Sequence, residues 1–93
     1  MKVSEKILSR DSETGAYTRL LHFDAGGETS DVLTHDFYEE VYILEGSITD
    51  KRLGRTFSQG MYAYRTPGMK HGPWVATDGC LTFEVRYLSA PPK

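Results

Sequence analysis

Apolar residues in this chain come in short runs with a two-residue period, and turn residues separate the runs. In the run 80–88, alternate positions form two sets on opposite faces of a strand: Leu81, Phe83, Val85 and Tyr87 on one face, and Cys80, Thr82, Glu84 and Arg86 on the other. No segment has a convincing 3.6-residue period. The pattern therefore predicts an all-β sandwich or barrel, and periodicity alone does not choose between the two.

The runs rich in Val, Ile, Thr, Tyr and Phe define the predicted strands, which cover residues 6–9, 16–24, 31–35, 39–44, 47–50, 55–58, 61–65 and 80–88. Turns are predicted at residues 11–15 and 25–27. A further tight turn is predicted at Glu45-Gly46, where glycine can supply a positive φ. The terminal segment 89–93 is predicted to be frayed.

Length and charge narrow the possible functions. At 93 residues the chain is predicted to be one domain, residues 1–93. The net charge of -2 comes from 11 basic and 13 acidic residues without a basic block, so we expect no nucleic-acid partner. No apolar stretch approaches the roughly 20 residues of a membrane span, and the polar N-terminus does not resemble a signal peptide, so we expect no membrane partner and a cytoplasmic location.

The histidines provide the first indication of chemistry. His35 lies at a predicted strand end, four residues before Glu39, and His71 follows a turn. Imidazoles and a carboxylate at strand ends commonly build metal sites in β-barrels, because neighbouring strands bring distant residues together. A His–Glu pair alone is weak evidence for a metal site, since such pairs usually lie on a solvated face.

The spacing around these residues resembles the two motifs of the cupin family, across about residues 27–46 and 60–75. The first motif is matched by Gly27, five residues, Leu33-Thr34-His35, three residues, Glu39, six residues and Gly46. The second is matched by Gly60, five residues, Thr66-Pro67-Gly68, two residues and His71, with the proline shifted by one position and Val75 in place of an Asn. The resemblance implies a double-stranded β-helix, or jelly-roll, barrel.

The resemblance further implies that His35, Glu39 and His71 are the ligands of one divalent metal ion. Leu33 occupies the position of the family's fourth ligand and cannot ligate. Two imidazoles and one carboxylate suit non-haem Fe(II), and Zn, Mn or Ni can occupy the same set. The alternative is a degenerate cupin whose two histidines only form hydrogen bonds. His22 is either a replacement for the missing ligand or a half-buried strand histidine.

Several side chains near the motif ends are candidates for lining a substrate pocket, although such residues are more often core: Phe37, Tyr62, Tyr64, Arg65 and Trp74. The sequence does not decide whether Tyr62 with Tyr64 or Ala63 with Arg65 faces inward. An inward Arg65 would favour an anionic substrate.

The stretch 66–73 resembles the cupin branch of the acetylacetone-cleaving and dihydroxyacetophenone-type dioxygenases, which also includes the sensor domain of zinc-binding anti-sigma factors. The resemblance therefore implies either a metal-dependent, dioxygenase-like enzyme acting on a small oxygenated substrate, or a non-catalytic metal- or ligand-binding module. The enzyme is favoured, because the sequence shows no helical sigma-binding region. A sugar isomerase or lyase is a third alternative. By analogy with small cupins, we expect a homodimer.

Overall fold

The computed structural model describes residues 3–88, and in this range the chain forms strands and loops without a helix. The strands are β1 (Val3–Arg10), β2 (Tyr17–Phe23), β3 (Gly27–Glu28), β4 (Tyr38–Asp50), β5 (Arg55–Ser58), β6 (Tyr62–Arg65), β7 (Trp74–Ala76) and β8 (Cys80–Tyr87). The all-β prediction is confirmed. No helix that could cross a membrane occurs in this range.

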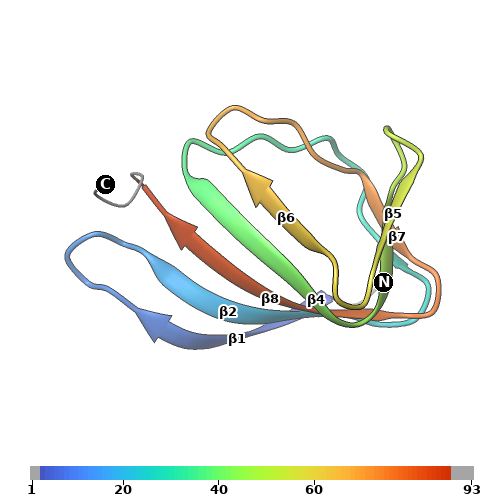
Figure 1. The fold of residues 1–93 in the computed structure, drawn as a ribbon, viewed down its shortest axis with the longest axis horizontal. Coiled ribbons are helices and arrows are strands. Elements are labelled where there is room, and N and C mark those ends of the chain that lie inside the picture. Colours follow the sequence, from blue (N-terminus) through green and yellow to red (C-terminus); the bar gives the residue numbers. More distant parts are fainter. Residues whose placement is uncertain (1–2, 89–93) are drawn as a thin grey trace.

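The strands form two antiparallel layers that share one long strand (Figure 1). The first layer contains β1, β2, β8, the first half of β4 and β6, and the second contains β3, β7, the second half of β4 and β5. Because β4 passes from one layer to the other, the sheet curls around an interior, as in a jelly-roll barrel.

The predicted turn at Glu45-Gly46 is wrong, because Gly46 lies inside β4. The pairing of β4 with β8 shifts between Ile43 and Glu45, and Gly46 has a φ of +73°. This irregularity is a β-bulge, which bends a strand and increases its twist. Glycine is therefore needed here to carry β4 between the two layers rather than to end a strand.

The predicted strand 31–35 is also wrong. This segment is a loop whose ladder-type pairing is one isolated bridge, between Leu33 and His71. Conversely, β3 and β7 were not predicted, because strands of two and three residues are too short to show an alternating pattern. The predicted frayed terminus 89–93 lies outside the described residues.

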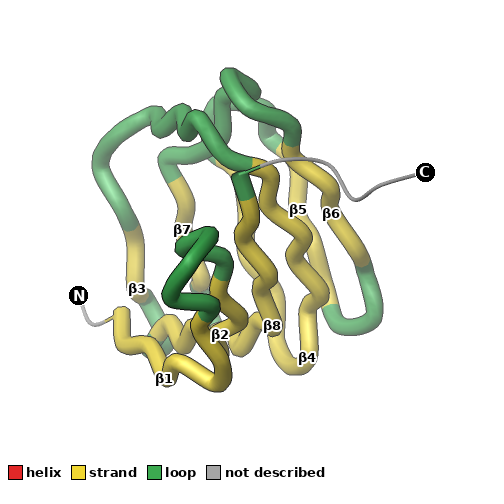
Figure 2. Tube along the Cα trace, turned by 90° about the vertical axis from the view of Figure 1, so that its left-hand side faces the viewer, coloured by secondary structure: helices red, strands yellow, loops and turns green. Residues whose placement is uncertain are grey.

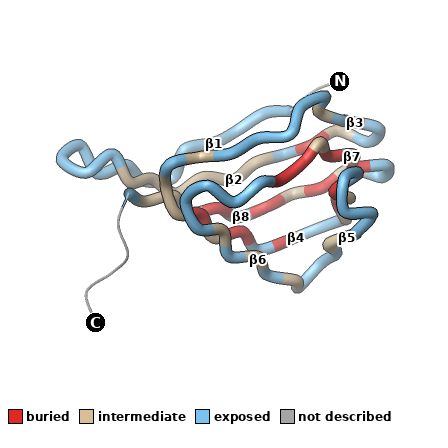
Figure 3. Tube along the Cα trace, turned by 90° about the horizontal axis from the view of Figure 1, so that it is seen from above, coloured by how far each residue is buried: buried red, intermediate tan, exposed pale blue. Residues whose placement is uncertain are grey.

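The core lies between the two layers and is small (Figure 3). Its buried apolar members are Phe23, Val41, Ile43, Ile48, Trp74, Ala76 and Cys80, and buried positions gather on β4, β7 and β8 whereas β1 is exposed. Burial raises the pKa of the Cys80 thiol to about 11, so this side chain behaves as a small apolar core residue.

Polar side chains are also buried, and two of them lie on the inward face of β8. Thr82 and Glu84 are 2% and 5% exposed, whereas Phe83 on the opposite face is 36% exposed. The apolar set of β8 thus faces outward. An interior lined by charged and hydroxyl groups is costly unless these groups are paired or bind a ligand, so the barrel interior is a candidate site.

Candidate functional site

Two loops meet at one end of the barrel and carry the two motif histidines (Figure 2). The backbones of Leu33 and His71 exchange two hydrogen bonds, with N···O distances of 2.8 and 2.9 Å, and the Gly68 N–H donates to the His35 carbonyl at 2.8 Å. These bonds tie the loop before β4 to the loop before β7. His35 and His71, 36 positions apart in the sequence, are therefore placed side by side, with ring centroids 4.8 Å apart.

A buried carboxylate supports the loop that carries His71. Asp50, at the end of β4, is 1% exposed and accepts hydrogen bonds from the Gly72 and Leu53 N–H groups, both at 3.0 Å. The bond to Gly72 is buried, so Asp50 holds the backbone next to His71 in place. Sequence analysis did not single out Asp50, because its role depends on a contact 22 residues away.

The three predicted ligands come together. One candidate ligand atom from each of His35, Glu39 and His71 lies within 4.8 Å of the other two. The Nε2 atoms of both histidines are buried and have no hydrogen-bond partner among the described residues. Orphaned buried nitrogens are rare in folded proteins and call for a bound partner. The donor set of two imidazoles and one carboxylate is suited to a divalent metal ion.

Both histidines are neutral at neutral pH. Burial, with the nearby Arg65 guanidinium adding to its effect, lowers the pKa of His71 to about 4. Burial also lowers the pKa of His35, with Arg86 adding to the effect. The neutral imidazole is the form that ligates a metal or accepts a hydrogen bond.

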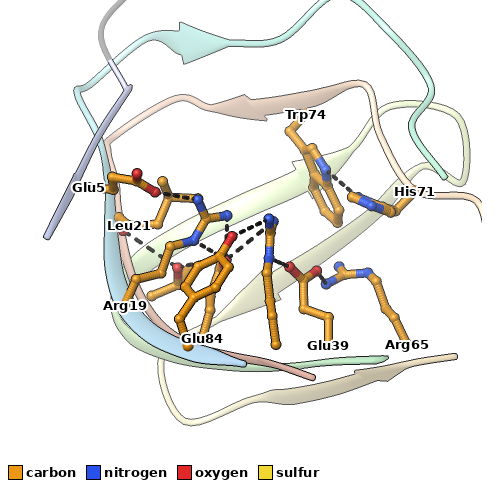
Figure 4. Close-up of polar contacts among 11 residues, drawn as sticks. Glu5, Arg19, Leu21, Glu39, Arg65, His71, Trp74 and Glu84 are labelled. Carbon is orange, nitrogen blue, oxygen red and sulfur yellow. Dashed lines mark hydrogen bonds and ion pairs between the residues drawn. The ribbon is translucent and has the colours of Figure 1, made fainter. Parts of the chain in front are cut away.

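Glu39 is held between two arginines (Figure 4). Arg65 donates to its Oε1 at 3.1 Å, and Arg86 donates to its Oε2 at 2.5 Å. Burial alone would raise the pKa of Glu39, but Arg86 and Arg65 outweigh burial, and the pKa lies below its ordinary value. Glu39 is therefore an anion. Each oxygen retains a second lone pair, so the carboxylate can coordinate a metal ion while still accepting a hydrogen bond from an arginine.

Arg86 belongs to a wider ionic network that sequence analysis missed. Glu84 lies two residues before it on β8, accepts from Thr82 Oγ1 at 2.8 Å and forms an ion pair with Arg19 of β2 at 2.8 Å. Alternation along β8 does place Thr82, Glu84 and Arg86 on one face. The missing information was that this polar face is the inner one.

The site occupies one end of a cavity of about 340 Å³, large enough for a small organic molecule. Apolar side chains from both layers line most of it, including Leu21, Val41, Ile43, Ile48, Phe57 and Met61. Leu33 also lines it, at the position of the missing fourth ligand. A ligand here would contact a mainly apolar wall and a smaller number of polar and charged groups.

The other predicted pocket residues divide into two groups. Arg65 and Trp74 line the cavity, and Phe37 stacks on the His35 ring at 4.5 Å. Tyr64 is 45% exposed, whereas Ala63 and Arg65 are partly buried, so Ala63 with Arg65 is the inward set. Tyr62 reaches the cavity edge but is 54% exposed.

His22 lies apart from the other two histidines. Its side chain is 52% exposed, lies 3.4 Å from the Asp24 carboxylate and does not line the cavity. The structure therefore gives it no role as a replacement ligand.

Glu40, next to Glu39 in the sequence, follows strand alternation and faces outward. There the Tyr62 and Tyr87 hydroxyls donate hydrogen bonds to it at 2.5 and 3.0 Å.

A curled two-layer barrel with two histidines and a glutamate at one end is the arrangement of a cupin. The model of the ChrR cupin-like domain family matches residues 1–88, and the chain belongs to that family. A comparison with curated protein sequences found no match.

Solved structures support the fold. An RmlC-like cupin from Shewanella frigidimarina is 18% identical, with 94% of this chain and 77% of that chain covered and a TM-score of 0.76. An acetylacetone dioxygenase from Acinetobacter johnsonii is 17% identical, with coverages of 91% and 59% and a TM-score of 0.78. In the complex of Rhodobacter sphaeroides SigE with the anti-sigma ChrR, the identity is 21%, the coverages are 89% and 44% and the TM-score is 0.69. The chain thus spans less than two thirds of the last two proteins.

Proposed function

We propose that this chain is a metal-dependent cupin that acts on a small oxygenated molecule in its cavity. The observation that carries the proposal is the pair of buried, unpartnered Nε2 atoms of His35 and His71 beside the Glu39 carboxylate. A divalent ion there would supply Lewis acidity toward a carbonyl or enolate oxygen. The protein supplies the rest: neutral imidazoles, a carboxylate held ionised by arginines, and an apolar cavity that limits access of water.

Fe(II) is the proposed ion, with Zn, Mn or Ni as alternatives, because two histidines and one carboxylate leave several coordination positions open. The dioxygenase-like activity is part of this proposal and is supported by the fold shared with the acetylacetone dioxygenase. Oxygen consumption by iron-loaded protein with small β-dicarbonyls would test it. Turnover that persists under strict anaerobiosis would instead favour a sugar isomerase or lyase type of chemistry.

Metal content tests the site itself. Protein purified without chelator is expected to carry close to one metal ion per chain, and His71→Ala is expected to lower this content at least about tenfold, because it removes one of only three ligands. The matched control is His22→Ala, which removes the outward-facing histidine and should leave the content unchanged. Elemental analysis measures all three. A metal-free wild type, or equal metal in His71→Ala, would contradict the proposal.

One contact favours a second candidate, a non-catalytic module that binds a small ligand without metal. The Trp74 indole N–H, which can only donate, lies 3.3 Å from His71 Nδ1. Neutral His71 then carries its proton on Nε2 and presents a hydrogen-bond donor to the cavity. Metal binding at Nε2 requires the opposite tautomer and hence the loss of this bond.

This conflict predicts that Trp74→Phe binds metal more tightly than the wild type. The phenyl ring keeps the packing but removes the indole N–H, so His71 can place its proton on Nδ1 at no cost. Since a neutral hydrogen bond is worth about 0.5–1.5 kcal/mol, Zn²⁺ affinity should rise roughly two- to tenfold. Competition with a chromophoric chelator measures it. Phe57→Leu, which changes the edge contact on Trp74 but not its N–H, is the control. Unchanged or weaker binding by Trp74→Phe would show that the contact does not oppose metal.

We also propose that the chain forms a homodimer through the outer face of its first layer. Tyr42 on β4 lies between Tyr62 on β6 and Phe83 on β8 in the strand register, and all three are at least 36% exposed. A continuous aromatic face of this kind is typical of an interface. Sedimentation analysis of the wild type and of Phe83→Glu would decide, with a monomeric wild type contradicting the proposal.

A further inference from the structure

The three arginines that line the cavity are unequally paired. Arg19 is saturated: it forms two contacts with Glu84 Oε1, at 2.8 and 2.9 Å, and one with Glu5 at 2.6 Å. Arg86 donates to Glu39 and, at 2.8 Å, to the Tyr17 hydroxyl. Arg65, by contrast, makes one side-chain hydrogen bond within residues 3–88, to a Glu39 oxygen at 3.1 Å.

Arg65 has the weakest charge compensation of the three arginines, because it shares its carboxylate, Glu39, with Arg86. The cavity lining contains three arginines, Arg19, Arg65 and Arg86, but only two carboxylates, Glu39 and Glu84. Glu5, outside the lining, adds a third carboxylate 2.6 Å from Arg19, so the three arginines are balanced in number and differ in how closely each is paired. Arg19 pairs with Glu84, and Arg86 makes the shorter contact with Glu39. The side chain of Arg65 is only 13% exposed, so solvent compensates its charge poorly.

The position of Arg65 is suited to a ligand anion. Its guanidinium lies over the Trp74 ring, 5.2 Å from the centroid. Figure 4 shows the Arg65 side chain beside that of Glu39, on the same side of the close-up as His71. Stacking on an aromatic ring restricts the plane of the guanidinium, and a planar fork of N–H donors matches a carboxylate in two-point contact. The unpartnered histidine nitrogens lie in the same cavity and offer a contact for a second oxygen.

We propose that the cavity selects small oxo-carboxylates, with the ligand carboxylate bound by Arg65 and a neighbouring carbonyl oxygen directed to the site of His35, Glu39 and His71. This assignment names the substrate class and rests on the proposed small-molecule function. The Arg65 contact itself operates with or without a metal ion.

A pair of nearly isosteric probes tests the assignment. Acetoacetate and acetylacetone differ by an anionic oxygen in place of a methyl group, and binding of each is measured by calorimetry to chelator-treated and to Zn²⁺-loaded protein. Acetoacetate is expected to bind about ten- to hundredfold more tightly. Arg65→Met should abolish this preference, and Arg65→Lys should retain part of it, because an ammonium keeps the charge but not the fork. Arg55→Met, at an exposed arginine on β5, is the control and should retain the whole preference.

Equal affinities for the two probes, a preference that survives Arg65→Met, or no acetoacetate binding at millimolar concentration would overturn the assignment. Melting temperatures of the variants establish that each is folded. If Arg65→Met does not fold, the reduced preference expected of Arg65→Lys still tests the assignment. The metal proposal is judged separately. Metal-loaded protein without anion preference would reject the carboxylate class alone, whereas anion preference in a chain that binds no metal would reject the metal-dependent function and leave the carboxylate class standing.

Discussion

Replacing Glu39 with glutamine is expected to destabilise the fold by about 3–5 kcal/mol, the usual cost of removing one partner from a buried ionic group. The Glu39 side chain is 3% exposed, and those of Arg65 and Arg86 are 13% and 16% exposed. A glutamine oxygen can accept from one of the two guanidiniums, but its NH₂ group then faces the other as a second donor. Arg65 would then have no carboxylate partner among the described residues, and Arg86 would keep only a longer ion pair with Glu84, at 3.9 Å.

The adjacent residue provides a matched control. Glu40→Gln makes the same chemical change on the opposite face of β4, where tyrosine hydroxyls rather than arginines contact the carboxylate, and its cost is expected to stay below about 1 kcal/mol. Urea unfolding followed by the fluorescence of Trp74, the one tryptophan of the chain, measures both. Equal costs for the two variants would mean that the arginine pair does not depend on Glu39.

A double variant isolates the ionic contribution. Adding Arg86→Met to Glu39→Gln removes one of the two arginine charges that Glu39 compensated, so the double variant should be less destabilised than the sum of the single variants predicts. Strict additivity would contradict an ionic origin of the cost. If Glu39→Gln alone does not fold, recovery of a cooperative unfolding transition in the double variant would still reveal the coupling.

The motif spacing predicted correctly which distant residues meet. His35, Glu39 and His71 are assigned by position in two short motifs, and the structure brings them together because hydrogen bonds between the two loops set their distance. The prediction of a strand at residues 31–35 was wrong because of these same loop-to-loop hydrogen bonds. The backbone bonds of this segment connect it to a loop rather than to a strand, and no local pattern distinguishes these cases.

The charged part of the site could not be predicted from the sequence. Glu39 and Arg86 face each other in the register of β4 and β8, 47 positions apart, and only the pairing of these strands makes them neighbours. Alternation along β8 separated Thr82, Glu84 and Arg86 from the apolar positions. It could not show that the polar set faces inward, because an apolar face normally marks the buried side, whereas here Thr82 and Glu84 are buried and Phe83 is exposed.

The second large effect is expected at the bulge of β4. Gly46→Ala should cost about 2–5 kcal/mol, from two separate causes: a positive φ, which costs an L-residue about 1–2 kcal/mol, and overpacking, which costs about 1–3 kcal/mol. A Cβ at Gly46 would lie 2.2 Å from the carbonyl oxygen of Gly79. This oxygen accepts the Ser47 N–H at 3.2 Å, so moving it away disturbs the pairing of β4 with the start of β8.

Gly60→Ala separates the two causes, because Gly60 also has a positive φ, +86°, but no atom lies within 4 Å of an added Cβ. It should therefore carry only the conformational cost of about 1–2 kcal/mol. Urea unfolding of the two variants gives the overpacking cost as their difference. Equal destabilisation would show that the Gly79 carbonyl can move aside without a cost in the free energy of unfolding. It would also show that β4 does not need a glycine to cross between the layers. A clear excess for Gly46→Ala would establish that this close approach, rather than a turn, is why a glycine stands at the end of the first motif.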